Sequence, residues 1–323
     1  MIPSIGLLTV LAGIALGALS PELQGQPPVT LRAALVRYGF DTAVGAADAP
    51  RLDAPLTSSD FGASPTAFAA AYYFRGELQG EGLGRLHVSV FDRPSGRWKH
   101  APAIRKPVGS VLGVRVSARY VLVEGHTSPS AGVGLLLNRA SLRVVTRLPG
   151  YGLRLLRGDT IVYHANMVHF APLHQERLIV FDPQTRREVE IFPGRQESAI
   201  AATYRRSIRA TYDSLPAAQK ATFEQSAYGP VDDFDRSISF LADRPTGDRL
   251  AFVASYDSDR LDKKIPRAQT LVQCDRKAPL VWSCSERDLD EAASAYAFEL
   301  RRQPLGWFEN ADIDPLIKRV LDR

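Results

Sequence analysis

Three histidines recur at intervals of five residues, at His164, His169 and His174, in a chain that holds six histidines in all. A zinc site needs three or four nitrogen, oxygen or sulfur ligands that converge at about 2 Å. A loop that folded His164 and His169 toward Glu124 or Asp257 would supply such a set. The spacing is not that of the H-E-x-x-H helix, however. The alternative is that His164 ends a strand and the other two histidines lie in a polar loop.

A wider set of polar residues falls in four loops that we expect on one face of a sheet structure. Such side chains bind ligands, and two carboxylates at a suitable separation also act as acid and base in glycoside hydrolysis. The sequence does not supply that separation, so we assign no catalytic residue. The candidate ligand-binding residues are Glu77, Glu124, His126, His164, Asn166, His169 and Asp257.

Two acidic segments offer oxygen ligands for calcium. One holds Asp257, Asp259 and Asp262, and the other runs from Asp232 to Asp235. Neither has the glycine or the closing glutamate of an EF-hand loop, and acidic loops are more often solvated surface. The chain also lacks a G-x-S-x-G elbow and a phosphate-binding loop. We therefore predict no resident cofactor, with a divalent metal as the alternative.

The overall composition is that of a folded protein without a nucleic-acid site. Hydrophobic residues make up 45% of the chain and charged residues 23%, which excludes wholesale disorder. The net charge is +5, but 40 basic residues are interspersed with 35 acidic ones. A nucleic-acid interface would show a clustered basic stripe with aromatic residues among it. No such stripe is present.

The first residues suggest export. Residues 1–21 carry no charged side chain, and residues 5–19 form an apolar run that is short for a membrane span and suited to a signal peptide. We predict a signal peptide or an uncleaved anchor over residues 1–26, and a periplasmic or extracellular location. Because no lysine or arginine precedes the apolar run, an anchor stays open as the alternative. Contact with a membrane is expected only through this segment.

Two cysteines agree with an oxidising compartment. Cys274 and Cys284 lie symmetrically about Pro279, so a hairpin that turns there places them opposite each other. A disulfide closing so small a loop adds about 2.5–3 kcal/mol by the chain-entropy estimate. The alternative is a pair of buried free thiols in a reducing compartment.

The elements that position these residues repeat along the chain. Each unit is predicted to run strand, loop, strand, tight turn, strand. The turns begin at Asp92, Asn138, Asp182 and Asp275, at steps of 46, 44 and 93 residues. The first two steps have the size of one propeller blade. Short Asp and Asn side chains bond backbone amides two residues on, which explains their position without any function.

The long third step holds either a poorly marked blade or an insertion. Residues 195–228 favour a helical insertion, because Ile200, Tyr204, Ile208 and Thr211 share one helical face. The prediction is therefore four blades over residues 69–284, with a fifth blade assembled from the chain ends as the alternative.

The flanking regions differ in character from the repeats. Residues 27–68 are predicted to be an extension or linker, irregular over 43–66, with a helix or a strand at 30–40. Residues 285–323 are predicted to be a helical tail packed on the domain, which starts at a capping box of Ser285 and Asp288.

Two segments, RLHVSVFDRPSGRW and RLIVFDPQTRREVEIF, resemble blades of the β-propeller families found in exported bacterial proteins, of the TolB-like or WD40-like kind. The resemblance covers residues 69–284 and lacks the Trp-Asp dipeptide. It implies a mainly β fold, a propeller-like array of four or five antiparallel blades. Because such folds serve unrelated activities, no catalytic residue carries over.

We therefore predict an exported, non-enzymatic binding or scaffold module of the cell envelope, with a protein or small-molecule ligand on its loop face. The alternative is an envelope hydrolase or lyase with a polar, metal-binding site near His164 and His169.

Overall fold

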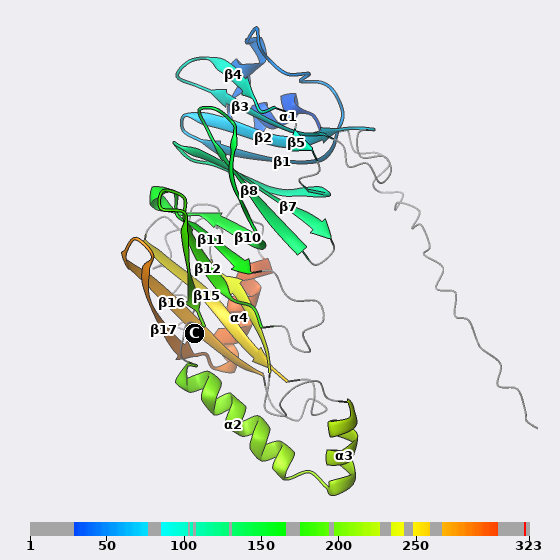
Figure 1. The fold of residues 1–323 in the computed structure, drawn as a ribbon, viewed down its shortest axis with the longest axis vertical. Coiled ribbons are helices and arrows are strands. Elements are labelled where there is room, and N and C mark those ends of the chain that lie inside the picture. Colours follow the sequence, from blue (N-terminus) through cyan, green and yellow to red (C-terminus); the bar gives the residue numbers. More distant parts are fainter. Residues whose placement is uncertain are drawn as a thin grey trace, which may run out of the picture.

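The computed structural model of this protein (Figure 1) shows four antiparallel sheets that follow one another along the chain. The predicted signal peptide, residues 1–26, and the first two residues of the predicted extension lie outside the residues that the structure describes. Those residues are 29–76, 85–102, 104–105, 108–128, 131–165, 175–193, 197–226, 234–241, 248–258, 267–302 and 320.

Each sheet is a meander in which every strand pairs with the next one in sequence. The first sheet has a short extra strand, β5 (Ile104–Arg105), paired with β3. The strands are β1 (Leu56–Ser64), β2 (Ala67–Phe74), β3 (Arg85–Asp92) and β4 (Arg97–His100) in the first sheet; β6 (Ser110–Val116), β7 (Tyr120–Ser128), β8 (Ala131–Asn138) and β9 (Val144–Leu148) in the second; β10 (Gly150–Leu155), β11 (Ile161–Ala165), β12 (Leu178–Asp182) and β13 (Arg187–Phe192) in the third; and β14 (Asp235–Phe240), β15 (Arg249–Asp257), β16 (Ala268–Ala278) and β17 (Val281–Asp288) in the fourth.

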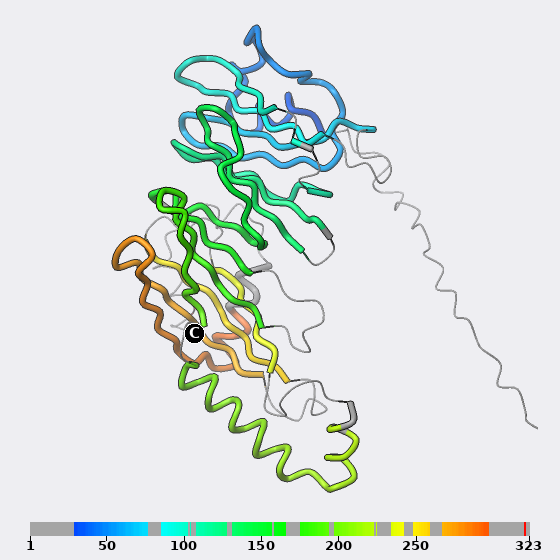
Figure 2. The backbone as a smooth tube through the Cα atoms, viewed as in Figure 1, coloured from blue at the N-terminus to red at the C-terminus, as the bar shows by residue number. Residues whose placement is uncertain are grey.

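The predicted mainly β fold with four antiparallel blades is confirmed, and the described residues contain no fifth sheet. The sheets form an open stack. Figure 2 shows the chain advancing from the first sheet at one end to the fourth sheet near the other, and no sheet of the described residues closes on itself.

The sequence prediction found three strands in each unit and missed the first. The irregular linker predicted over residues 43–66 was therefore wrong for β1, which occupies residues 56–64. In β1, small and polar residues hide the strand from the sequence pattern, and a neighbouring backbone approaches closely there. A Cβ atom on Gly62 of β1 would lie 2.4 Å from the carbonyl oxygen of Val114 in the next sheet. Glycine is the residue that a strand uses at such a contact, and it resembles a loop in sequence.

The tight turns predicted to begin at Asp92, Asn138 and Asp182 are built as predicted. The turn predicted to begin at Asp275 is wrong, because Asp275 lies within β16, opposite Ser283 of β17, and the chain turns only after Ala278. Asn138 accepts the backbone N–H groups of Ala140 and Ser141, both at 3.0 Å. Asp182 likewise accepts the N–H of Gln184 at 3.0 Å. These bonds give the Asp and Asn residues of the turns a structural role.

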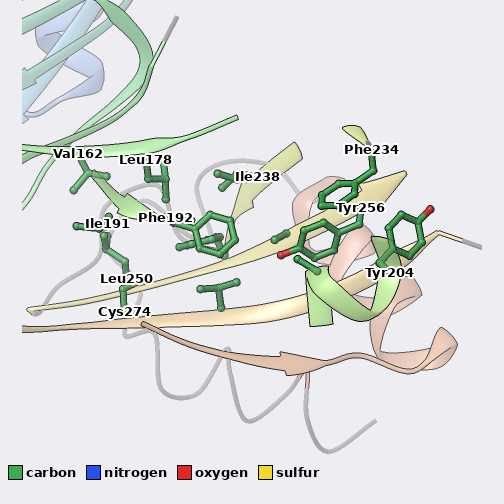
Figure 3. Close-up of a cluster of buried hydrophobic side chains, with 14 of the residues drawn as sticks. Val162, Leu178, Ile191, Phe192, Tyr204, Phe234, Ile238, Leu250, Tyr256 and Cys274 are labelled. Atoms are coloured by element: carbon green, nitrogen blue, oxygen red, sulfur yellow. The ribbon is translucent and has the colours of Figure 1, made fainter. Parts of the chain in front are cut away.

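Buried apolar clusters lie between consecutive sheets and hold the stack together. The largest joins the third and fourth sheets, and Figure 3 shows Leu178 and Val162 facing Leu250 and Ile238 across it. A separate cluster covers the outer face of the first sheet with α1 (Leu31–Arg37) and the short helix η2 (Asp41–Gly45). The N-terminal region therefore caps one end of the array.

The predicted helical insertion is confirmed as α2 (Ala199–Asp213) and α3 (Ala217–Ser226). Ser198 caps α2 by accepting the N–H of Ala201. Tyr204 and Ile208 of α2 are buried in the cluster between the third and fourth sheets. The insertion thus extends that core.

The C-terminal helix α4 (Glu291–Arg302) begins later than predicted. Ser285 and Asp288 belong to strand β17, so they do not form a capping box. Asp290 is the residue whose side chain accepts a helix N–H, that of Ala293, at 2.8 Å. Among the helices of the described residues, none is both long and apolar enough to cross a membrane.

The predicted disulfide is present. Cys274 of β16 and Cys284 of β17 are directly paired in register, with their Cα atoms 4.0 Å apart. Cys274 is fully buried within the core between the third and fourth sheets. The bond therefore ties the outer hairpin of the fourth sheet to its core.

Candidate functional site

Glu124 binds the neighbouring sheet instead of facing a ligand. Its side chain on β7 accepts the backbone N–H of Gly152 at 2.5 Å and of Leu153 at 3.1 Å, both on β10. Arg115 lies 3.7 Å from the same carboxylate, and Glu124 is only 6% exposed. Buried carboxylates are stable when several donors satisfy them. This residue clamps the second sheet to the third.

His164 is packed between aromatic rings. It stacks on Tyr151, with ring centroids 5.1 Å apart, and meets the ring of Phe240 edge-on at 5.4 Å. Its Nδ1 atom lies 3.5 Å from a carboxylate oxygen of Glu176, too far for a good hydrogen bond. His164 is 5% exposed, so a substrate cannot reach its ring without a rearrangement of these neighbours.

Glu176, which the sequence prediction missed, joins the third sheet to the fourth. Its carboxylate accepts the hydroxyl of Tyr151 at 2.8 Å and the N–H of Ile238 at 2.5 Å. Its backbone exchanges two further bonds with Arg236, both at 3.0 Å. Burial alone would raise the pKa of Glu176, but His164, the Ile238 N–H and the Tyr151 hydroxyl together hold it below its ordinary value. Burial and the nearby Glu176 raise the pKa of Tyr151.

The structure brings Glu124 and His164 to the same place, and side chains and backbone fill it. Both flank Gly152, whose φ is +61°. A Cβ atom on Gly152 would lie 2.9 Å from Cδ2 of His164. Two predicted site residues therefore converge, but they converge on a packed junction of two sheets.

The metal hypothesis gains no support from the residues that the structure describes. Within them, no group of three His, Cys, Asp or Glu side chains is arranged to hold an ion. His126 lies on β7 opposite Ser110. Glu77, Asn166, His169 and His174 are outside the described residues, so their placement stays a prediction.

Asp257, in contrast, lines a pocket of about 320 Å³ at one end of the fourth sheet. We call it the fourth-sheet pocket. Strands β14 and β15 supply two cross-strand pairs to it, Asp235 opposite Asp257 and Ser237 opposite Ser255. Among the residues that the structure describes, the lining consists of Glu176, Asp235, Arg236, Ser237, Ser255, Asp257 and Arg267.

The charges of the fourth-sheet pocket are partly neutralised by Arg267. Its Nε atom donates to Asp257 at 2.8 Å. Two carboxylates directly opposite each other in a sheet repel, and a guanidinium beside one of them relieves that repulsion. Ser255 accepts a bond from Gln269 at 3.0 Å. The pocket therefore presents hydroxyls and carboxylates on a fixed sheet surface.

The two acidic segments interpreted separately as calcium loops meet in this pocket through Asp235 and Asp257. Their other members, Asp232, Asp233, Asp259 and Asp262, lie outside the described residues. The sequence did carry a signal for the pocket. Asp235-Arg236-Ser237 and Ser255-Tyr256-Asp257 are mirror-image patterns that put polar side chains at alternate positions of two strands. Neighbouring strands that mirror each other in this way place their polar residues on one face.

Comparison with known proteins gives little beyond this geometry. No family model matches the chain. No curated protein matches it either. Among solved structures, the chain is similar to the tricorn protease at 11% identity and a TM-score of 0.32, over 70% of this chain and 26% of that one. The β-propeller domain of the Trilobed protease from Pyrococcus furiosus is similar at 10% identity and a TM-score of 0.33, over 77% of this chain and 85% of that one.

The chain thus spans about a quarter of the tricorn protease. Likenesses of this strength do not single out TolB-like or WD40-like proteins, and they assign no activity.

Proposed function

We propose that this protein is a non-enzymatic binding module of the cell envelope, and that the fourth-sheet pocket is its ligand site. The observation that carries the proposal is the pair of mirrored strand patterns, which present Asp235, Asp257, Ser237 and Ser255 together at a pocket of about 320 Å³. Ligand pockets of small molecules begin at about this size. Glu124 and His164, two of the residues of the hydrolase alternative, are instead occupied in packing.

The charges of the pocket favour a cationic group on the ligand. Among the described residues, three carboxylates and two guanidiniums line it. Arg267 faces Asp257, and Arg236 donates to the backbone of Glu176. The surplus of one negative charge, with two serine hydroxyls beside it, suits a guanidinium or an ammonium group with further donors. A charge-assisted hydrogen bond of this kind is about twice as strong as a neutral one.

The experiment is a calorimetric titration with N-acetyl-L-arginine amide, with the uncharged citrulline analogue as the matched probe. We expect binding of the arginine compound only, and a loss of about tenfold or more in affinity for Asp257→Asn, because Arg267 then repels the ligand. Asp53→Asn is the control, since Asp53 pairs with Arg32 at an exposed position. Equal binding of both probes, or no effect of Asp257→Asn, contradicts the proposal.

Export is the second part of the proposal, and it is supported by the apolar N-terminal run and the Cys274–Cys284 bond. Expression of the full chain in a bacterial host, followed by fractionation and thiol titration without reductant, tests it. We expect protein without free thiols in the periplasm or the medium. Reduced protein confined to the cytoplasm would argue against export.

A further inference from the structure

A second pocket adjoins the fourth-sheet pocket on the other side of Arg267. We call it the helix pocket, because strand β16, the end of β17 and the start of α4 enclose it. Its volume is about 560 Å³. The lining residues are Arg267, Ala268, Gln269, Asp288, Leu289, Glu291 and Ser294. Arg267 belongs to both pockets, so a ligand that passes along this side chain occupies the two together.

Taken together, the two pockets are acidic in a chain whose net charge is +5. Five carboxylates and two guanidiniums line them in the part of the chain that the structure describes. Glu176 is the carboxylate already used to join the sheets, by the Tyr151 and Ile238 bonds. The helix pocket adds Asp288 and Glu291, both exposed, against the shared Arg267. Counted over the described residues, each pocket therefore has more carboxylates than guanidiniums, and Arg267 lies at the boundary between the two.

The ion pair between the pockets is exposed enough to rearrange. The side chain of Arg267 is 59% exposed and that of Asp257 is 25% exposed. Ion pairs near the surface add little to stability, so a competing cation on the ligand can replace Arg267.

We infer that the two pockets form one bipartite site for a basic peptide segment with two cationic side chains, an inference that rests on the proposed function of the fourth-sheet pocket. The helix pocket combines apolar Ala268 and Leu289 with the amide of Gln269 and the hydroxyl of Ser294. Such a lining suits a lysine or arginine, whose stem is apolar and whose head is charged. The amide and hydroxyl also suit the backbone of a peptide, which a simple polyamine lacks.

The test compares acetylated, amidated peptides in the titration described above. One set carries a single arginine, and the other carries two arginines separated by glycine spacers of increasing length. We expect an optimal two-arginine peptide to bind at least about tenfold more tightly than the single-arginine peptide, because the second contact is made within one complex. Glu291→Gln should remove most of that gain. Glu197→Gln, on the exposed pair with Arg205, is the control.

The outcomes separate the two proposals. If the single-arginine peptide binds but no two-arginine peptide binds more tightly, the bipartite site is wrong and the proposed pocket stands. If a polyamine such as spermidine binds as tightly as the two-arginine peptide, the site does not select a peptide. If neither peptide binds, both proposals fail. Thermal unfolding of Glu291→Gln is the folding control. A midpoint equal to that of the wild type shows that the variant is folded.

Discussion

At the residue scale, Glu124 and His164 show how a polar side chain that looks reactive in a sequence can serve packing. Glu124 uses both oxygens on the backbone N–H groups of Gly152 and Leu153. His164 fills the space between Tyr151 and Phe240. Neither role has a sequence signature, because the partners lie on other strands or in another sheet. The type of a polar residue indicates which reactions or ligands its side chain can support. Its neighbours decide whether the side chain is available for them.

Glu124→Gln should destabilise the protein. The glutamine places an N–H₂ group against one of two backbone donors, which leaves a buried donor unsatisfied and costs about 1–3 kcal/mol. Urea unfolding measures the loss. Asp53→Asn is again the control at an exposed ion pair. Equal unfolding midpoints for the two variants would show that Glu124 is no clamp.

Glu176 should make the stability depend on pH in the acid range. Its pKa is lowered in the folded protein from an ordinary value of 4.5. A group whose folded pKa is lowered stabilises the protein fully above the unfolded value, and this contribution is lost as the pH falls through the folded pKa. We expect the free energy of unfolding of the wild type to fall below about pH 4.5, and Glu176→Gln to be less stable near neutrality with a shallower acid decline. Parallel curves for the two proteins would contradict this.

At the scale of elements, the first strand of each sheet is the part that sequence patterns failed to mark. β1 reads LTSSDFGAS and β10 reads GYGLRL, so small and polar residues interrupt the alternation that marks a strand. The cause lies in the neighbouring sheet. β1 packs against β6 so closely that a side chain at Gly62 would meet the backbone of Val114. The same close approach that makes the strand necessary to the stack removes the apolar residues that would predict it.

Gly62→Ala should therefore cost more than a glycine substitution in open space. The new methyl group forces the backbones of β1 and β6 apart, and overpacking of this kind costs about 1–3 kcal/mol. Gly45→Ala is the matched control, because a Cβ atom added there would have nothing within 4 Å and the φ of Gly45 is not positive. Chemical unfolding compares the two variants, and equal free energies of unfolding would refute the close contact.

The β16–β17 hairpin should lose stability on reduction. The disulfide joins residues only 10 apart in sequence, and opening it restores freedom to the unfolded chain worth about 2–3 kcal/mol. The measurement is the urea midpoint with and without dithiothreitol. The double variant Cys274→Ala, Cys284→Ala should not respond to the reductant. A wild-type midpoint that does not move would show that the bond adds nothing.

At the scale of the whole molecule, the four sheets form an open stack whose cores are distinct. Leu35 of α1 lies in the cluster that caps the first sheet, and Ile208 of α2 lies in the cluster between the third and fourth sheets. In a linear array each unit contacts only its neighbours, so stability is distributed along the stack. A substitution in one core should then destabilise only the sheets that border that core.

Hydrogen exchange tests this distribution of stability with a reciprocal pair of variants. Leu35→Ala should lower amide protection in β2 and β3 and leave β15 and β16 near wild type, because its cavity lies in the first core only. Ile208→Ala should do the reverse. Uniform loss of protection across all four sheets in either variant would indicate a single cooperative core instead.

The sequence by itself determined the repeat, the turns, the helical insertion and the disulfide, because each depends on residues close together in the chain. Asn138 and Asp182 bond their own turns, and Cys274 and Cys284 face each other across one hairpin. The tertiary structure decided the first strands, the open stacking and the site. Asp235 and Asp257 meet only through pairing of β14 with β15, and Arg267 borders both pockets. Contacts between distant segments depend on register and on packing between sheets, which local patterns do not encode.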